Sequence, residues 1–191
     1  KSFNIKLAPE KCFFFREKIH FLGHVVSKDG ILTDPDKIEK VTNWPEPTKP
    51  DELRSFLAFM GYYRKFSKDF SKITRPLADL LPPTTSKNGP KKAVKQWNWS
   101  DAERKVFQEL KDILSSPPIL AYPDFQASFK LHIDASTHGL GAILYQEQDG
   151  QERVISYASR SLTKSEKNYC AYRLEFLALK WAVTEKFSDY L

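Results

Sequence analysis

The chain has 191 residues, of which 41% are hydrophobic and 14% aromatic, a size that suits one large domain or two small ones. With 28% charged residues and 14 Phe, it can bury enough apolar surface to offset the entropy lost on folding, which excludes a disordered tail. No stretch approaches the roughly 20 apolar residues that span a bilayer, and no secretory leader is visible. Cys12 and Cys170 lie too far apart for a disulfide framework or a metal-ligand motif, so we expect a reducing, intracellular setting.

The charge is unevenly distributed along the chain. Residues 1–95 contain 19 Lys and Arg against 11 Asp and Glu, whereas residues 96–191 contain 11 against 13. A basic first half favours an anionic partner that this half binds. An ordinary solvated basic surface explains the same counts, and both interpretations stay open.

The first elements predicted along the chain are short strands. Residues 11–15 and 19–26 are rich in aromatic and β-branched side chains, and the polar residues 16–18 lie between them. This pattern predicts two strands joined by a turn. A second turn is predicted at residues 28–30, leading into Ile31 and Leu32, so we expect a hairpin or small meander.

Helices are predicted next. Asp34-Pro35 is typical of an N-cap followed by proline at the first helical position, and this helix should end before Pro45. A longer helix is predicted by apolar residues three and four positions apart, namely Leu53, Phe56, Leu57, Met60, Tyr63 and Phe66. Gly61 interrupts that pattern at a cost of about 1 kcal/mol relative to alanine, which suggests close packing there. Residues 73–81 predict a further short helix.

A linker and a second folded unit follow. Residues 82–90 are rich in Pro, Thr and Ser and show no periodicity, which predicts the clearest boundary in the chain. Ser100 and Glu103 form an S-x-x-E capping box that predicts a helix ending before Pro117.

Three strand candidates follow at residues 128–134, 141–146 and 153–158, with a turn at 148–150. A second capping box, Thr163 with Glu166, predicts a long helix through Phe187. Three strands then still need covering, so we expect this unit to be truncated.

Two acidic residues are candidates for metal chemistry. Asp134 ends an apolar strand, where a charge must be solvated, paired or bound to a metal, and Glu175 lies in the last helix beside its apolar face. Such a pair can share a hard cation such as Mg²⁺. A strand-end Asp entering a loop and a helix Glu facing water explain the same pattern. Gly139-Leu140-Gly141 opens a strand, not a helix, so we interpret it as tight backbone packing and not as a phosphate loop.

A basic set marks the helical part of the chain. Arg54, Lys65, Lys68 and Lys72 fall near one face if the helix stays continuous, and Arg64 lies beside them. Such a ridge can follow a phosphate backbone without reading bases. A solvated helix face opposite the apolar stripe has the same appearance.

Taken together and in order, these residues resemble the Pol polyprotein of gypsy-type LTR retrotransposons and related retroelements, over nearly the whole chain. The motifs that carry the resemblance are Lys11-Cys12-x-Phe14, Phe21-Leu22-Gly23-His24, Asp34-Pro35, Trp44-Pro45-x-Pro47, Leu53-Arg54-Ser55-Phe56-Leu57, Gly61-Tyr62-Tyr63-Arg64-Lys65-Phe66, Trp97-x-Trp99, Asp134-Ala135-Ser136, Gly139-Leu140-Gly141-Ala142, Tyr157-Ala158-Ser159-Arg160 and Glu166-x-x-Tyr169.

The resemblance implies an α+β architecture. Residues 1–34 would be the end of a polymerase palm with the primer-grip hairpin, 35–82 a helical thumb, and 83–96 a linker. Residues 97–191 would be the N-terminal part of an RNase H-like α/β domain, with three antiparallel strands and a long helix but without the remainder of the sheet.

The resemblance also implies a site. Asp134 and Glu175 would be the first two of four catalytic carboxylates that bind Mg²⁺ or Mn²⁺. An RNA–DNA hybrid or template–primer duplex would contact residues of the hairpin and the thumb, namely Phe21, Leu22, Gly23, His24, Arg54, Arg64, Lys65, Lys68 and Lys72. The polymerase Tyr-x-Asp-Asp turn and the later RNase H acids are absent from this sequence, so we expect the chain to bind metal weakly and to be inactive alone.

The expected partners are nucleic acid and the rest of the Pol polyprotein, without a membrane, inside the cell in a cytoplasmic particle or the nucleus. An alternative is a domesticated, non-catalytic module that binds nucleic acid or protein. In a third hypothesis a second copy of the chain completes the sheet in a homo-oligomer.

Overall fold

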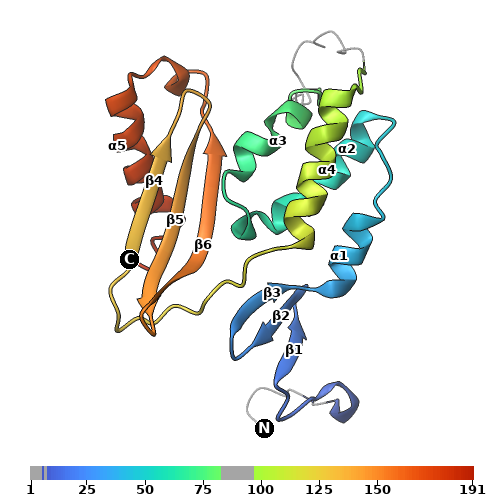
Figure 1. Ribbon diagram of the computed structural model, residues 1–191, viewed down its shortest axis with the longest axis vertical. Helices are drawn as coiled ribbons and strands as arrows, with labels where there is room; N and C mark the ends of the chain where they lie inside the picture. The colour runs from blue at the N-terminus through green and yellow to red at the C-terminus, as the bar shows by residue number, and fades with distance from the viewer. Residues whose placement is uncertain (1–5, 7, 83–96) are drawn as a thin grey trace.

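The computed structural model describes residue 6, residues 8–82 and residues 97–191 (Figure 1). The linker predicted at 83–96 lies outside the described residues. The first sheet is an antiparallel meander of β1 (Lys18–Phe21), β2 (His24–Ser27) and β3 (Gly30–Thr33). A hairpin or small meander was predicted here, but with different strands.

The first predicted strand, residues 11–15, is wrong. A 3₁₀ turn, Pro9–Lys11, comes before an irregular segment in which Phe13, Phe14 and Phe15 are exposed. The second predicted strand instead folds back on itself at Leu22 and Gly23, whose φ angles are +47° and +74°. This is the type I′ geometry whose twist matches that of antiparallel strands. The aromatic composition of residues 11–15 favours a strand, but β2 pairs with residues 18–21 instead.

Helices and one 3₁₀ turn make up the central unit: α1 (Pro35–Thr42), α2 (Pro50–Tyr62), η2 (Arg64–Phe66), α3 (Phe70–Ala78) and α4 (Asp101–Ser115). Asp34 caps α1 by accepting from the Asp36 N–H at 3.1 Å, and the predicted capping box of Ser100 and Glu103 starts α4. Both predictions are confirmed.

The apolar stripe predicted for α2 is buried, although the helix is not continuous. Leu53, Phe56, Met60, Tyr63 and Phe66 all lie in the core of the helical unit, where the Phe56 and Phe107 rings of α2 and α4 are 4.4 Å apart. The α-helix ends at Tyr62 and a separate 3₁₀ turn carries Phe66. The close packing predicted at Gly61 is wrong, because a Cβ there would meet no atom within 4 Å.

The second sheet consists of β4 (Lys130–Ala135), β5 (Gly139–Gln148) and β6 (Gln151–Ser161), all antiparallel in that order. These strands and the turn at Asp149 and Gly150 were predicted. The helix α5 (Ala171–Trp181) covers one face (Figure 1), and a π-helical turn, Ala182–Lys186, extends it.

The start predicted for this helix is wrong. Thr163 and Glu166 do form their reciprocal bonds, but they cap only a 3₁₀ turn, Glu166–Asn168. Cys170 is extended, with φ −67° and ψ 161°, which breaks the helical path before Ala171.

The helical unit packs on the second sheet along β6. The Ser71 N–H donates to Ser159 Oγ at 2.9 Å, so α3 begins against that strand. The connection after α4 pairs with the meander, because Ile31 and Leu120 exchange two backbone hydrogen bonds, at 2.8 and 3.0 Å. The fold is therefore α+β, as predicted, and contains two three-stranded antiparallel sheets. Among the described residues no helix is long and apolar enough to cross a membrane.

Candidate nucleic-acid and metal site

Asp134 lies on the face of the second sheet that is turned away from α5. Its neighbours on β4, Leu131 and Ala135, pack into the core that α5 covers, and Asp134 has the opposite parity along the strand. It pairs across the ladder with Gly141 of β5. The Asp134 side chain is exposed.

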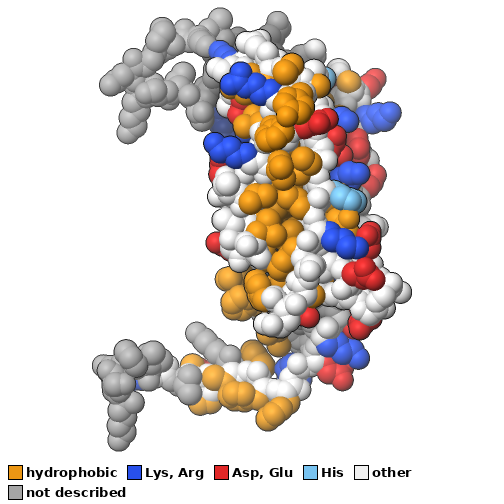
Figure 2. All heavy atoms as spheres, turned by 90° about the vertical axis from the view of Figure 1, so that its left-hand side faces the viewer, with side chains coloured by type: hydrophobic (Ala, Val, Ile, Leu, Met, Phe, Trp, Pro, Cys, Tyr) orange, Lys and Arg blue, Asp and Glu red, His pale blue; other side chains and the backbone are white. Residues whose placement is uncertain are grey.

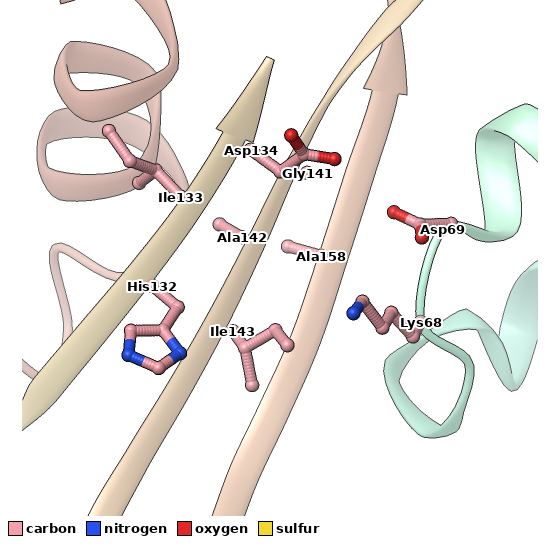
Figure 3. Close-up of a pocket in the computed structure, with 9 residues that line it drawn as sticks. All are labelled: Lys68, Asp69, His132, Ile133, Asp134, Gly141, Ala142, Ile143 and Ala158. Carbon is pink, nitrogen blue, oxygen red and sulfur yellow. The ribbon is translucent and has the colours of Figure 1, made fainter. Parts of the chain in front are cut away.

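A pocket of about 210 Å³ opens beside Asp134. The sheet supplies one wall, which includes His132, Asp134 and Gly141, and the segment between η2 and α3 supplies Lys68 and Asp69 (Figure 3). Asp69 has a left-handed backbone, with φ +55°, and its Oδ1 lies 3.2 Å from the position of a Cβ on Gly141. Strands and loop therefore bring two carboxylates and one ammonium group to the same pocket.

Sequence reasoning missed Asp69. Its only signal was its place in a basic segment, and its distance along the chain from Asp134 concealed the pairing. His132, also in the pocket wall, is engaged, because its Nε2 lies 2.6 Å from the Tyr145 hydroxyl.

The predicted metal ligands are not brought together on one face. Glu175 is exposed on α5, whereas Asp134 faces away from that helix. Across the part of the chain that the structure describes, no group of three or more His, Cys, Asp or Glu side chains could hold a metal ion. Asp134 and Glu175 by themselves thus do not fit a complete divalent-metal site.

The predicted basic residues lie on three elements and not on one continuous helix face. Arg54 is on α2 and forms an exposed ion pair with Asp51 at 2.7 Å. The others follow α2 in a segment that we call the basic loop, residues 64–72, which contains Arg64, Lys65, Lys68 and Lys72. The single basic face depended on a continuous helix, which the structure does not have.

Burial changes the electrostatics around the basic loop. Desolvation lowers the pKa of Lys65, whose Nζ lies 5.3 Å from the centroid of the Phe66 ring. Burial, followed by the charge of Arg64, lowers the pKa of Lys186 in the π-helical turn. Lys186 therefore adds positive charge beside the loop, and sequence reasoning missed it because it lies in the other unit.

The predicted primer-grip residues sit at the tip of the meander. Phe21 and Leu22 are 60% and 71% exposed, whereas His24 is half-buried among three aromatic rings. Desolvation lowers the pKa of His24, the charge of Lys65 lowers it further, and Asp34 opposes them. Its Nδ1 is buried without a hydrogen-bond partner among the described residues.

The outer side of α5 carries an apolar band. Figure 2 views this side of the molecule and shows apolar side chains running along it. Exposed residues of α5 and the turn after it contribute Tyr172, Phe176, Leu179 and Val183, spaced as on one helix face.

Residues 99–191 match the family described as the RNase H-like domain found in reverse transcriptase. The chain is 42% identical over 184 residues to the Retrovirus-related Pol polyprotein from transposon gypsy of Drosophila melanogaster. This match covers 94% of the chain and 17% of that protein. It is 39% identical over 183 residues to the corresponding protein from transposon 412 of the same fly, covering 96% of this chain and 14% of that protein. The chain is therefore similar, over nearly its whole length, to one short part of these retrotransposon Pol polyproteins.

Two solved structures share the fold of this chain. The foamy viral protease-reverse transcriptase in complex with dsDNA superposes with a TM-score of 0.75 and 22% identity, covering 92% of this chain and 35% of that one. The same viral protein in complex with an RNA/DNA hybrid gives a TM-score of 0.73 and 22% identity, covering 92% of this chain and 23% of that one. At this identity the likeness concerns the fold alone.

Proposed function

We propose that this chain is a nucleic-acid-binding part of a reverse transcriptase/RNase H. Residues 1–34 are the end of the palm, 35–82 the thumb, and 97–191 an RNase H-like domain. The Drosophila relatives, which are Pol polyproteins, support this assignment. The viral proteins of the same fold, which were solved with dsDNA and with an RNA/DNA hybrid, support a duplex as the ligand.

One observation carries the proposal: Lys68 of the basic loop and Asp134 of the sheet line the same pocket. Lys and Arg side chains bind a duplex through its phosphates. A nucleic-acid strand whose phosphates contact the basic loop therefore passes Asp134. The basic loop and the candidate catalytic acid then contact the same duplex.

Asp134 and Glu175 are proposed to hold Mg²⁺ or Mn²⁺ only together with further carboxylates of the complete polyprotein, because the two residues by themselves do not form a metal site among the described residues. These hard cations prefer carboxylate oxygens, and a complete site would use them as Lewis acids in the hydrolysis of the RNA strand. Asp69 shares the pocket with Asp134, but no group of three or more metal-ligating side chains forms among the described residues. Further carboxylates are therefore proposed to come from elsewhere in the polyprotein. This chain alone is therefore proposed to bind a duplex without cleaving it.

Duplex affinity measured as a function of salt tests the binding part. Fluorescence anisotropy with a labelled RNA·DNA hybrid is compared for the wild type and for Lys68→Gln/Lys72→Gln, two exposed residues of the basic loop. If both bind phosphates, the slope of log K against log salt falls by roughly 0.7–0.9 for each lysine that is replaced. The matched control, Lys105→Gln/Lys164→Gln, removes the same charge at exposed positions outside the loop and keeps the slope. An equal fall in both variants would mean that net charge alone attracts the duplex.

The apolar band on α5 supports one alternative, a module that binds protein. Exposed apolar patches often mark protein–protein contacts, and Tyr172 and Phe176 are 70% and 58% exposed. Partner binding that is insensitive to salt and is abolished in Tyr172→Ser/Phe176→Ser, with duplex binding intact, favours this alternative.

A further inference from the structure

The tip of the meander is fastened to the end of α2 by two consecutive tyrosines. The Tyr62 hydroxyl donates to the Leu22 carbonyl, and the Tyr63 hydroxyl donates to the Gly23 carbonyl at 3.0 Å. In a two-residue turn the strand ladder does not use these carbonyls, so they bond to water or to groups from outside the hairpin. The tyrosine pair, Tyr62 and Tyr63, therefore satisfies both residues of the turn.

Ring packing closes the same contact. The His24 ring stacks on Tyr62 at 5.3 Å with an interplanar angle of 10°, and meets Tyr63 edge-on at 5.6 Å. A Cβ on Gly23 would lie 3.1 Å from the Tyr63 hydroxyl, so the turn approaches the tyrosine as closely as a glycine allows. Tyr63 is 3% exposed, and burial, followed by its neighbours Tyr62 and Asp34, raises its pKa to about 12. Its hydroxyl therefore remains a proton donor at neutral pH.

The turn itself is strained and exposes an apolar side chain. Leu22 has φ +47°, a region that disfavours side chains with a Cβ and that hairpin turns usually fill with Asn or Gly. Its side chain is 71% exposed. Strain held at an exposed position by surrounding contacts is typical of functional sites.

The tyrosine pair directly precedes the basic loop, which begins at Arg64. The two tyrosines thus link the turn to the cations that are proposed to bind phosphate, which follow them directly in the chain. We propose that Tyr62 and Tyr63 are positioning residues that hold the Leu22–Gly23 turn in register with the basic loop, so that both contact one duplex as a single surface. This inference rests on the proposed function, and it adds the two residues that set the geometry of that surface.

Photo-crosslinking tests the positioning. A p-benzoylphenylalanine in place of Leu22 is irradiated with a saturating labelled RNA·DNA hybrid, in the otherwise wild-type chain and with Tyr62→Phe/Tyr63→Phe. The phenylalanines keep the rings and remove only the two hydroxyls, so we expect the crosslink yield to fall about fivefold while the salt slope of binding is unchanged. Tyr122→Phe is the matched control, because the Tyr122 hydroxyl donates to Ser27 O at 2.9 Å at the other turn of the meander. It should keep the yield.

Amide hydrogen exchange in the free chain provides a second readout that needs no nucleic acid. Removing two hydrogen bonds should raise the exchange rate of residues 18–27 about tenfold in Tyr62→Phe/Tyr63→Phe, with no matching rise in α4. Unchanged exchange, or an unchanged crosslink yield at saturation, overturns the inference. If the wild type neither binds nor crosslinks to the hybrid, the proposed function and the contact role of the turn both fail, while exchange still decides whether the tyrosines hold it.

Discussion

Arg160 and Glu166 form a two-pronged ion pair, in which Nη1 donates to Oε2 at 2.8 Å and Nη2 donates to Oε1 at 2.9 Å. The pair joins the end of β6 to the turn that precedes α5. Glu166 also accepts from the Thr163 N–H at 2.7 Å, and the Arg160 guanidinium lies 5.7 Å from the centroid of the Trp181 ring. These contacts fix the position at which α5 begins to pack on the sheet.

We expect Glu166→Gln to lower the free energy of unfolding by about 1–2 kcal/mol, because it replaces charge-assisted bonds in a partly buried pair. Its side chain is 15% exposed. Glu147→Gln is the matched control: that carboxylate pairs with Lys130 at 3.3 Å but is 61% exposed, so its removal should cost less than about 0.5 kcal/mol. Urea unfolding of both variants measures the difference, and equal effects would show that the Arg160 pair has no special role.

The same pair should make stability depend on acid pH. The Arg160 guanidinium, followed by the Thr163 N–H, lowers the pKa of Glu166 from 4.5 to about 2. A carboxyl with a lower pKa in the folded state stabilises the fold above its unfolded pKa, and this stabilisation is lost as the pH falls towards the folded pKa. The difference in melting temperature between wild type and Glu166→Gln should therefore be constant above pH 4.5 and shrink between 4.5 and 2. A constant difference across that interval would contradict the lowered pKa.

The two glycines of β5 should respond differently to alanine. A Cβ on Gly139 would lie 2.7 Å from the Arg160 carbonyl oxygen, a backbone atom, whereas on Gly141 it would meet the Asp69 carboxylate at 3.2 Å, the end of a side chain that can move. We expect Gly139→Ala to cost about 1–3 kcal/mol through overpacking. Gly141→Ala should be nearly neutral. The strand gains about 0.5–1 kcal/mol when Gly becomes Ala, and this gain offsets the cost of moving the Asp69 side chain. Thermal or urea unfolding ranks the two, and a larger destabilisation in Gly141→Ala would mean that Asp69 is rigidly held.

Alanine at Gly61 should stabilise the chain. Sequence reasoning suggested close packing there, but a Cβ would meet nothing within 4 Å, and the residue is in the last turn of α2 with no positive φ. We expect a gain of up to about 1 kcal/mol in the free energy of unfolding. An unfolding curve shifted to lower urea would restore the packing hypothesis.

Local signals predicted the elements that depend on nearby residues. Asp34 and the box of Ser100 and Glu103 cap the helices that they were expected to cap, because the bonds form within three residues. The box at Thr163 forms equally well, yet α5 starts later, since a cap specifies a first turn and not its continuation.

Tertiary contacts decided the rest. The turn at Leu22 has no Asn or Gly at its first position, and the bonds that hold it come from Tyr62 and Tyr63, remote in sequence. Likewise Asp134 was identified from its strand, but its companions Lys68 and Asp69 became visible only when α3 packed against β6. Pairings of this kind leave no periodic pattern in one sequence.

We expect this chain alone to leave a labelled RNA·DNA hybrid uncut in Mg²⁺ or Mn²⁺. No group of three or more metal-ligating side chains forms in the described ranges, and two-metal hydrolysis needs more ligands than two carboxylates. The comparison is a chain continued into the following part of a related polyprotein, with Asp134→Asn in both. Cleavage by the longer chain that Asp134→Asn abolishes supports the assignment of Asp134. Cleavage by the 191-residue chain contradicts the predicted inactivity. Asp69→Asn is then the first variant to make, because Asp69 is the second carboxylate of the pocket that contains Asp134.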